Sequence, residues 1–73
     1  MKKNAGYEII KEEYYTRDNA IVLGKRGTDY VTWEYTKHND NYFWGHYFTF
    51  ENKAIHDFYT RLAKETDPDL IPF

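Results

Sequence analysis

The chain has 73 residues, with 10 basic and 12 acidic side chains and a formal net charge of −2. It has no cysteine, which excludes disulfides and cysteine-ligated zinc, and its charge argues against strong nonspecific binding to nucleic acid. No apolar run approaches the roughly 18 residues of a membrane span, and the first ten residues lack the apolar segment of a signal peptide. We therefore expect one small cytoplasmic domain over residues 1–73, with a core from about 6 to 66 and a tail from 67 to 73.

Aromatic residues are the main source of core for a chain of this size. Small domains without disulfides or metals depend on an unusually rich core. The chain offers 8 Tyr, 5 Phe and 2 Trp, and each ring can bury on the order of 150–250 Å². A few of these rings are enough to anchor the fold.

Residues 7–16 and 20–24 predict the first two strands. In YEIIKEEYYT the apolar positions change parity between Ile9 and Ile10, which predicts either a bulge or an edge strand. The continuous apolar run AIVLG is typical of a strand covered on both faces. The glycine-bracketed turn that closes it carries Lys25 and Arg26.

The next two strands are predicted at 30–36 and 41–50. The alternation in YVTWEYT predicts an apolar face and a face in water: Val31, Trp33 and Tyr35 on the first, Thr32 and Glu34 on the second.

The turn length between these strands leaves two registers open. A four-residue turn at 37–40 sets Tyr35 opposite Tyr42 and Trp33 opposite Trp44, whereas a three-residue turn sets Trp33 over Gly45. We favour the first register, with the large rings of both strands under a helix, because it leaves more polar atoms in water.

Helical spacing begins after Phe50. One stripe has the spacing i, i+3, i+4 and i+7: Ile55, Phe58, Tyr59 and Leu62. Asn52 is a suitable N-cap, Asp57 and Arg61 can pair on the outer face, and Pro68 ends the helix. The expected fold class is therefore α+β, a four-stranded antiparallel meander with one C-terminal helix on one face.

No catalytic, cofactor or metal site is predicted. The chain lacks serine as well as cysteine, and its three histidines are spaced eight and ten residues apart, which matches no metal motif. A single helix leaves one sheet face open, and we place Phe43 and Tyr47 on that face. An exposed apolar patch favours a non-enzymatic interaction module whose partner is a protein or a second copy, as in a homodimer.

The candidate interaction surface consists of five residues: Phe43, Tyr47, His46, Lys25 and Arg26. For His46 the alternative is a partly buried ring bonded within the fold. The alternative function is binding of single-stranded nucleic acid, with bases stacked on the sheet aromatics beside Lys25 and Arg26. The net negative charge disfavours it.

Several segments together resemble a known family: GYEI, IVLG, YVTWE, NYFWGHYF and AIHDFYTRL. Over residues 6–62 the chain resembles a family of small proteins of unknown function from Firmicutes, often carried on mobile or conjugative elements. The resemblance implies a bacterial, cytoplasmic setting and an accessory role. It implies no reaction, cofactor or functional residue.

Overall fold

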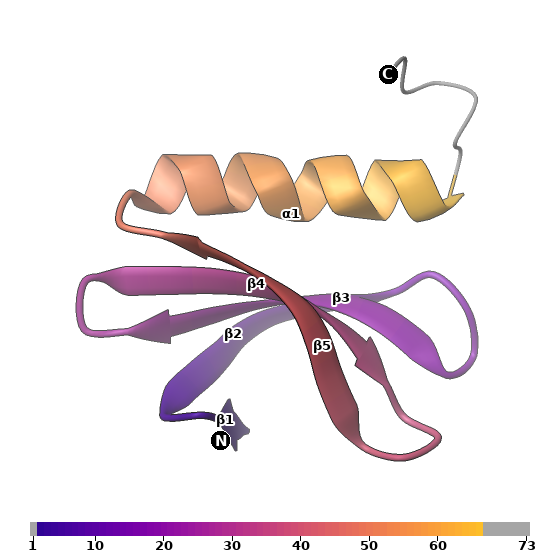
Figure 1. Ribbon diagram of the computed structural model, residues 1–73. Coiled ribbons are helices and arrows are strands. Elements are labelled where there is room, and N and C mark those ends of the chain that lie inside the picture. Colours follow the sequence, from indigo (N-terminus) through magenta and orange to yellow (C-terminus); the bar gives the residue numbers. More distant parts are fainter. Residues whose placement is uncertain (1, 67–73) are drawn as a thin grey trace.

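The computed structural model describes residues 2–66, which form an antiparallel sheet and one helix (Figure 1). In chain order the elements are β1 (Lys3–Asn4), β2 (Tyr7–Tyr14), β3 (Asn19–Arg26), β4 (Asp29–Thr36), β5 (Asn41–Phe48) and α1 (Glu51–Thr66). The strands are paired in sequence order, as in a meander. The α+β class and the single helix after the sheet are confirmed. Within the described residues no helix has the length and apolar character needed to cross a membrane.

The sheet has five strands, so the prediction of four is wrong. The additional strand, β1, is two residues long and pairs with the beginning of β2. Ala5 and Gly6 join the two strands with positive φ angles of 51° and 82°, the backbone of a type I′ hairpin turn. A two-residue strand is too short to show alternation, which is why the sequence pattern did not reveal it.

Strand β2 contains the predicted bulge. Its pairing with β3 shifts between Ile9 and Lys11, and the intervening Ile10 is exposed. Because β1 pairs only with Tyr7 and Glu8, the rest of β2 is also a sheet edge. Strand β2 therefore contains a bulge and is also an edge strand, the two explanations predicted for the change of parity between Ile9 and Ile10.

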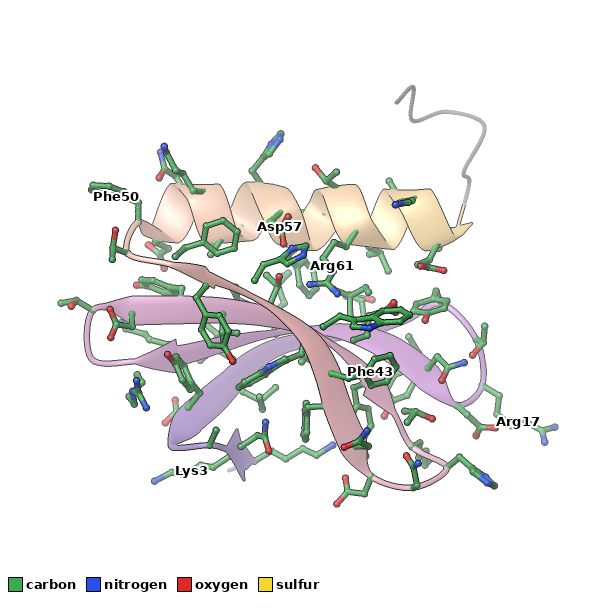
Figure 2. All side chains as sticks on the ribbon, viewed as in Figure 1. Lys3, Arg17, Phe43, Phe50, Asp57 and Arg61 are labelled. Atoms are coloured by element: carbon green, nitrogen blue, oxygen red, sulfur yellow. The ribbon has the colours of Figure 1, made fainter. Side chains whose placement is uncertain are left out.

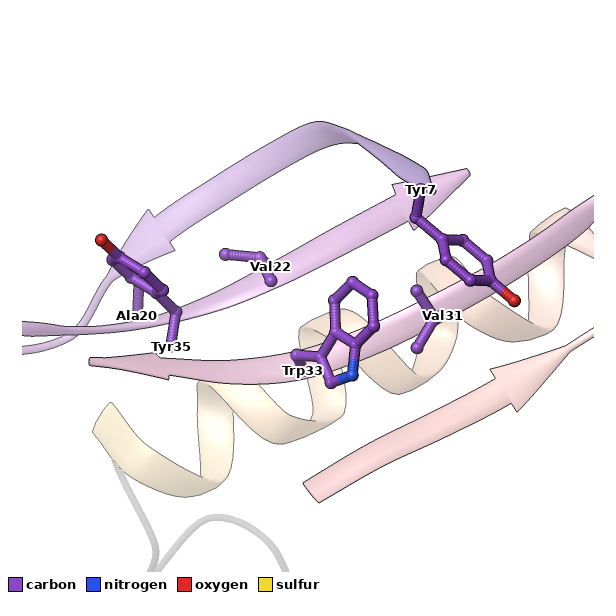
Figure 3. Packing of buried hydrophobic residues seen from close by; sticks show 6 residues of the cluster. All are labelled: Tyr7, Ala20, Val22, Val31, Trp33 and Tyr35. Atoms are coloured by element: carbon purple, nitrogen blue, oxygen red, sulfur yellow. The ribbon is translucent and has the colours of Figure 1, made fainter. Parts of the chain in front are cut away.

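The hydrophobic residues form two clusters, one on each face of the sheet. The cluster beneath the helix contains Ile21, Leu23, Tyr30, Ala54 and Phe58. The cluster on the opposite face contains Tyr7, Ala20, Val22, Val31, Trp33 and Tyr35 (Figure 3). The prediction that Trp33 and Tyr35 lie under the helix is therefore wrong. Thr32 and Glu34, expected in water, are buried on the helix side instead.

Aromatic rings cover the face that the helix leaves open. The ring centroids of Tyr7 on β2 and Tyr47 on β5 are 6.2 Å apart, although strands three places apart in a flat sheet are separated by about 14 Å. The sheet therefore curls over this face. At the other end, the ammonium group of Lys2 lies 4.1 Å from the centre of the Tyr35 ring. Curling explains how Trp33 is only 4% exposed without a second helix.

A bulge at Trp44 combines the two registers that the sequence left open. Tyr35 pairs with Tyr42 as the four-residue turn predicts, but the pairing shifts further along β5. Trp33 then lies over Gly45, where a Cβ atom would approach the indole Nε1 to 2.8 Å. Only glycine fits beneath the ring, and Trp44 is the extra residue of the bulge, with a φ of 53°.

The helix packs on the sheet through a stripe that only partly matches the predicted one: Phe58 and Leu62 are confirmed, and Ile55 and Tyr59 are not. Ala54 and Phe58 are fully buried and Leu62 packs beside them, so the core spacing is i, i+4, i+8. Ile55 and Tyr59 from the predicted stripe are 36% and 48% exposed. Asn52 is not the N-cap but lies inside the first turn. Pro68 and the predicted tail lie outside the described residues.

Candidate functional site

A polar cluster joins the helix to strands β4 and β5. The carboxylate oxygen Oδ2 of Asp57 accepts a hydrogen bond of 2.5 Å from Oγ1 of Thr32. The same oxygen lies 3.0 Å from Nδ1 of His46, which donates to it when that nitrogen carries a proton. Figure 2 shows Asp57 and Arg61 between the helix and the sheet. We call Thr32, His46, Asp57 and Arg61 the Asp57 clasp.

Arg61 completes the clasp. Its Nη1 donates to the backbone oxygen of Thr32 at 3.3 Å and to Oγ1 of Thr32 at 3.1 Å. Asp57 and Arg61 were predicted to pair on the outer face of the helix, which is wrong because both bond to Thr32 on the sheet. Their four-residue spacing was correctly recognised, but the helix is rotated so that this pair faces inward. Thr32 can be buried because both residues satisfy its hydroxyl group.

A buried carboxylate lies beside the clasp. Glu34 is only 5% exposed, and its Oε1 accepts a hydrogen bond of 2.6 Å from the hydroxyl group of Tyr15. Burial, together with this bond to the Glu34 carboxylate, raises the pKa of Tyr15 well above its usual value. Tyr15 therefore stays protonated and keeps donating to Glu34 throughout the physiological pH range.

Next to the clasp is a pocket of about 210 Å³, lined by Glu34, Trp44, His46, Arg61, Lys64 and Glu65. We call it the Trp44 pocket. Trp44 is 69% exposed, and within the fold its ring meets the Phe43 ring edge-on, with centroids 4.9 Å apart. A positive φ in a bulky residue is a backbone outlier, with a cost of order 1–3 kcal/mol. The fold thus holds a large ring in solvent on a strained backbone.

A second pocket, of about 370 Å³, lies at the other end of β5 and is lined by Tyr7, Asp29, Tyr30, Tyr47, Phe48 and Thr49. The guanidinium of Arg26 lies 4.4 Å from the centre of the Tyr7 ring and donates to the backbone oxygen of Ala5 at 3.4 Å. The ammonium group of Lys25 lies 5.8 Å from the centre of the Tyr30 ring. Both cations therefore have aromatic partners within the fold.

The five predicted surface residues do not share one face. Phe43 and His46 pair with Glu34 and Thr32 on the helix side. Tyr47 pairs with Val31, and Tyr47 and Arg26 both lie near Tyr7 on the opposite face. Three of the five residues lie on β5, the strand at one edge of the sheet: Phe43, His46 and Tyr47.

Of the six residues that line the Trp44 pocket, the sequence prediction includes only His46 and misses five: Glu34, Trp44, Arg61, Lys64 and Glu65. The available signal was Trp44 itself. Trp44 directly precedes Gly45, and Gly45 has to lie opposite Trp33 for the Trp33 ring to fit. Trp44 is therefore the position at which β5 can contain one extra residue.

The Asp57 clasp is not arranged for nucleophilic catalysis. In a nucleophile, base and acid triad the hydroxyl group bonds to the histidine, whereas Thr32 bonds to Asp57. Among residues 2–66 no group of three or more His, Cys, Asp or Glu side chains is placed to hold a metal ion. The geometry of the clasp is that of a link between helix and sheet.

No family model, no curated protein and no solved structure matches this chain.

Asp57→Ala is expected to lower the free energy of unfolding by about 2–3 kcal/mol, because hydrogen bonds to a charged group are lost in a partly buried site. Urea denaturation measures this change, with the exposed neighbour His56→Ala as control. An outer-face pair would contribute only a few tenths of a kcal/mol. A loss that small for Asp57→Ala would contradict the linking role of the clasp.

Proposed function

We propose that the protein is a non-enzymatic interaction module that self-associates through the outer edge of β5. The observation that carries this proposal is that the outer edge of β5 is unpaired and carries no charged side chain. Strand β5 pairs with β4 on one side only, so alternate residues along its eight-residue length direct unpaired backbone groups to the other side. An exposed edge of this kind is a template for pairing with another strand.

The second sheet edge provides an internal comparison. The free part of β2 carries Lys11, Glu12 and Glu13, and charged side chains are a common protection of strand edges. Strand β5, NYFWGHYF, contains no Lys, Arg, Asp or Glu. The bulge at Trp44 interrupts regular pairing at one point only, and the segments on either side of it keep their extended backbone.

A second copy of the chain fits this edge. Two β5 strands paired antiparallel about a two-fold axis form a self-complementary contact, the commonest arrangement among homo-oligomers. The strand carries no formal charge, so the two copies meet without repulsion between like charges. Tyr47, 63% exposed beside the edge, supplies a ring of the kind that dominates interface energetics. A small cysteine-free domain also gains stability by association.

Tyr47→Glu is expected to convert a dimer into a monomer that is still folded but less stable. The substitution places a charge in the contact between the two β5 strands and removes a ring that packs near Tyr7 and Trp33. Light scattering coupled to size exclusion measures the mass, and circular dichroism checks the fold. Tyr59→Glu is the matched control, since Tyr59 is 48% exposed on the helix, away from β5. A wild-type chain that is monomeric at high micromolar concentration contradicts the proposal.

The alternative, binding of single-stranded nucleic acid, has less support, because Lys25 and Arg26 lie beside aromatic rings of the fold and are not among the residues that line the Trp44 pocket. Phe43 and Tyr47 also lie on different faces, which separates two of the rings expected to stack with bases. The bacterial, cytoplasmic setting and the accessory role implied by the family resemblance stay predictions.

A further inference from the structure

The Trp44 pocket has a composition that the interaction edge does not explain. One wall is the exposed ring of Trp44, and the remaining five side chains are ionisable: Glu34, His46, Arg61, Lys64 and Glu65. Glu34 is a carboxylate held within the fold by Tyr15. Arg61 bonds to Thr32 through Nη1, and a guanidinium carries five N–H donors in all.

Simple ligands fit this lining poorly. If a partner inserted an apolar side chain, it would remove water from several charged groups of the pocket without pairing them, which costs free energy. A small anion meets the carboxylates of Glu34 and Glu65, and a small cation meets the positive charges of Arg61 and Lys64. The complementary molecule has a flat face for Trp44, N–H donors for a carboxylate and an anionic group for the basic side chains.

We propose that the Trp44 pocket binds a nucleobase joined to a phosphate, which goes beyond the self-association of β5. The base stacks on Trp44, and stacking of this kind tolerates any base. Glu34 or Glu65 accepts hydrogen bonds from the base, which favours guanine because its N1–H and N2–H donors are adjacent. Arg61 and Lys64 hold the phosphate, the anion for which arginine has a matching planar geometry.

The backbone at Trp44 supports this assignment independently of the pocket lining. A bulge residue with positive φ is accommodated most easily by glycine or asparagine. This chain instead carries its more exposed tryptophan there. Residues with strained backbone cluster at active sites and ligand-binding sites, and Trp44 is one of the residues that line the pocket. The edge-on contact with Phe43 fixes the direction of the ring.

Titration with guanosine monophosphate, followed by the two indole N–H signals in an NMR spectrum, tests the proposal. We expect the Trp44 signal to shift and the signal of Trp33, which is 4% exposed, to stay in place. Trp44→Ala should weaken binding on the order of tenfold or more. Guanosine and inorganic phosphate, added separately, should each bind more weakly than the nucleotide. A short single strand ending in guanosine monophosphate shows whether the natural source is a free nucleotide or a strand terminus.

Two variants separate this site from the proposed function. Tyr47→Glu, designed to disrupt self-association, should leave nucleotide binding unchanged, and Tyr59→Ala controls for loss of an exposed ring elsewhere. Three outcomes overturn the proposal: an unshifted Trp44 signal, equal binding by Trp44→Ala, and binding of a short peptide in preference to the nucleotide.

Discussion

Trp33→Ala is expected to lower the free energy of unfolding by about 3–5 kcal/mol, as large-to-small changes of a buried aromatic do. Trp33 is 4% exposed, and its ring meets those of Tyr7, Tyr42 and Tyr47 at centroid distances of 5.5, 5.5 and 6.4 Å. It also covers Gly45, where no side chain exists to fill the space left behind. Stabilities of small domains begin near 5 kcal/mol, so the variant should be close to unfolding at room temperature.

Trp44→Ala is the matched control for Trp33→Ala, because the same atoms are removed from a side chain that is 69% exposed. We expect a change within about 0.5 kcal/mol, which is usual for surface substitutions. Alanine also leaves the positive φ unrelieved, so no gain in stability is expected. Urea denaturation followed by circular dichroism, which needs no tryptophan signal, compares the two variants. Equal losses for both would show that the bulge does not separate the two rings as described.

The class of the fold could be predicted from the sequence, but the faces of the sheet could not. Alternation in β4 correctly separates Trp33 and Tyr35 from Thr32 and Glu34, yet it does not say which set meets the helix. Placing polar residues in water is a sound default. Here it is wrong because Thr32 and Glu34 find partners in distant segments, the helix and Tyr15.

The candidate site escaped prediction for a related reason. Its residues come from β4, β5 and the helix, and only the bulge at Trp44 brings the ring toward Arg61. A bulge adds one residue to a strand without leaving a distinctive sequence pattern. The sequence was therefore compatible with either of the two registers without a bulge. The steric fit of Trp33 over Gly45 was recognised as one option, whereas its combination with the four-residue turn was not.

The helix shows what periodicity alone can decide. The predicted stripe includes Ile55 and Tyr59 but not Ala54, because a spacing of i, i+3, i+4 and i+7 counted from Ile55 does not reach it. The helix lies close enough to the sheet that Ala54 is completely buried. The same rotation of the helix that buries Ala54 also directs Asp57 and Arg61 toward Thr32. Small residues therefore mark where a helix meets a sheet as well as large ones do.

Phe58→Ala is expected to cost about 3–5 kcal/mol in the free energy of unfolding, because it leaves a cavity between helix and sheet. Phe58 is the largest fully buried side chain among residues 2–66, and it lies in one cluster with Ile21, Leu23, Tyr30 and Ala54. Tyr59→Ala, one position along the helix, is the matched control and should change stability by less than about 1 kcal/mol, because Tyr59 is 48% exposed. Denaturant titration distinguishes this arrangement from the stripe predicted from the sequence, for which both variants would be strongly destabilised. A comparable loss for both residues would mean that the helix is rotated toward Tyr59, which would also remove Asp57 and Arg61 from the clasp.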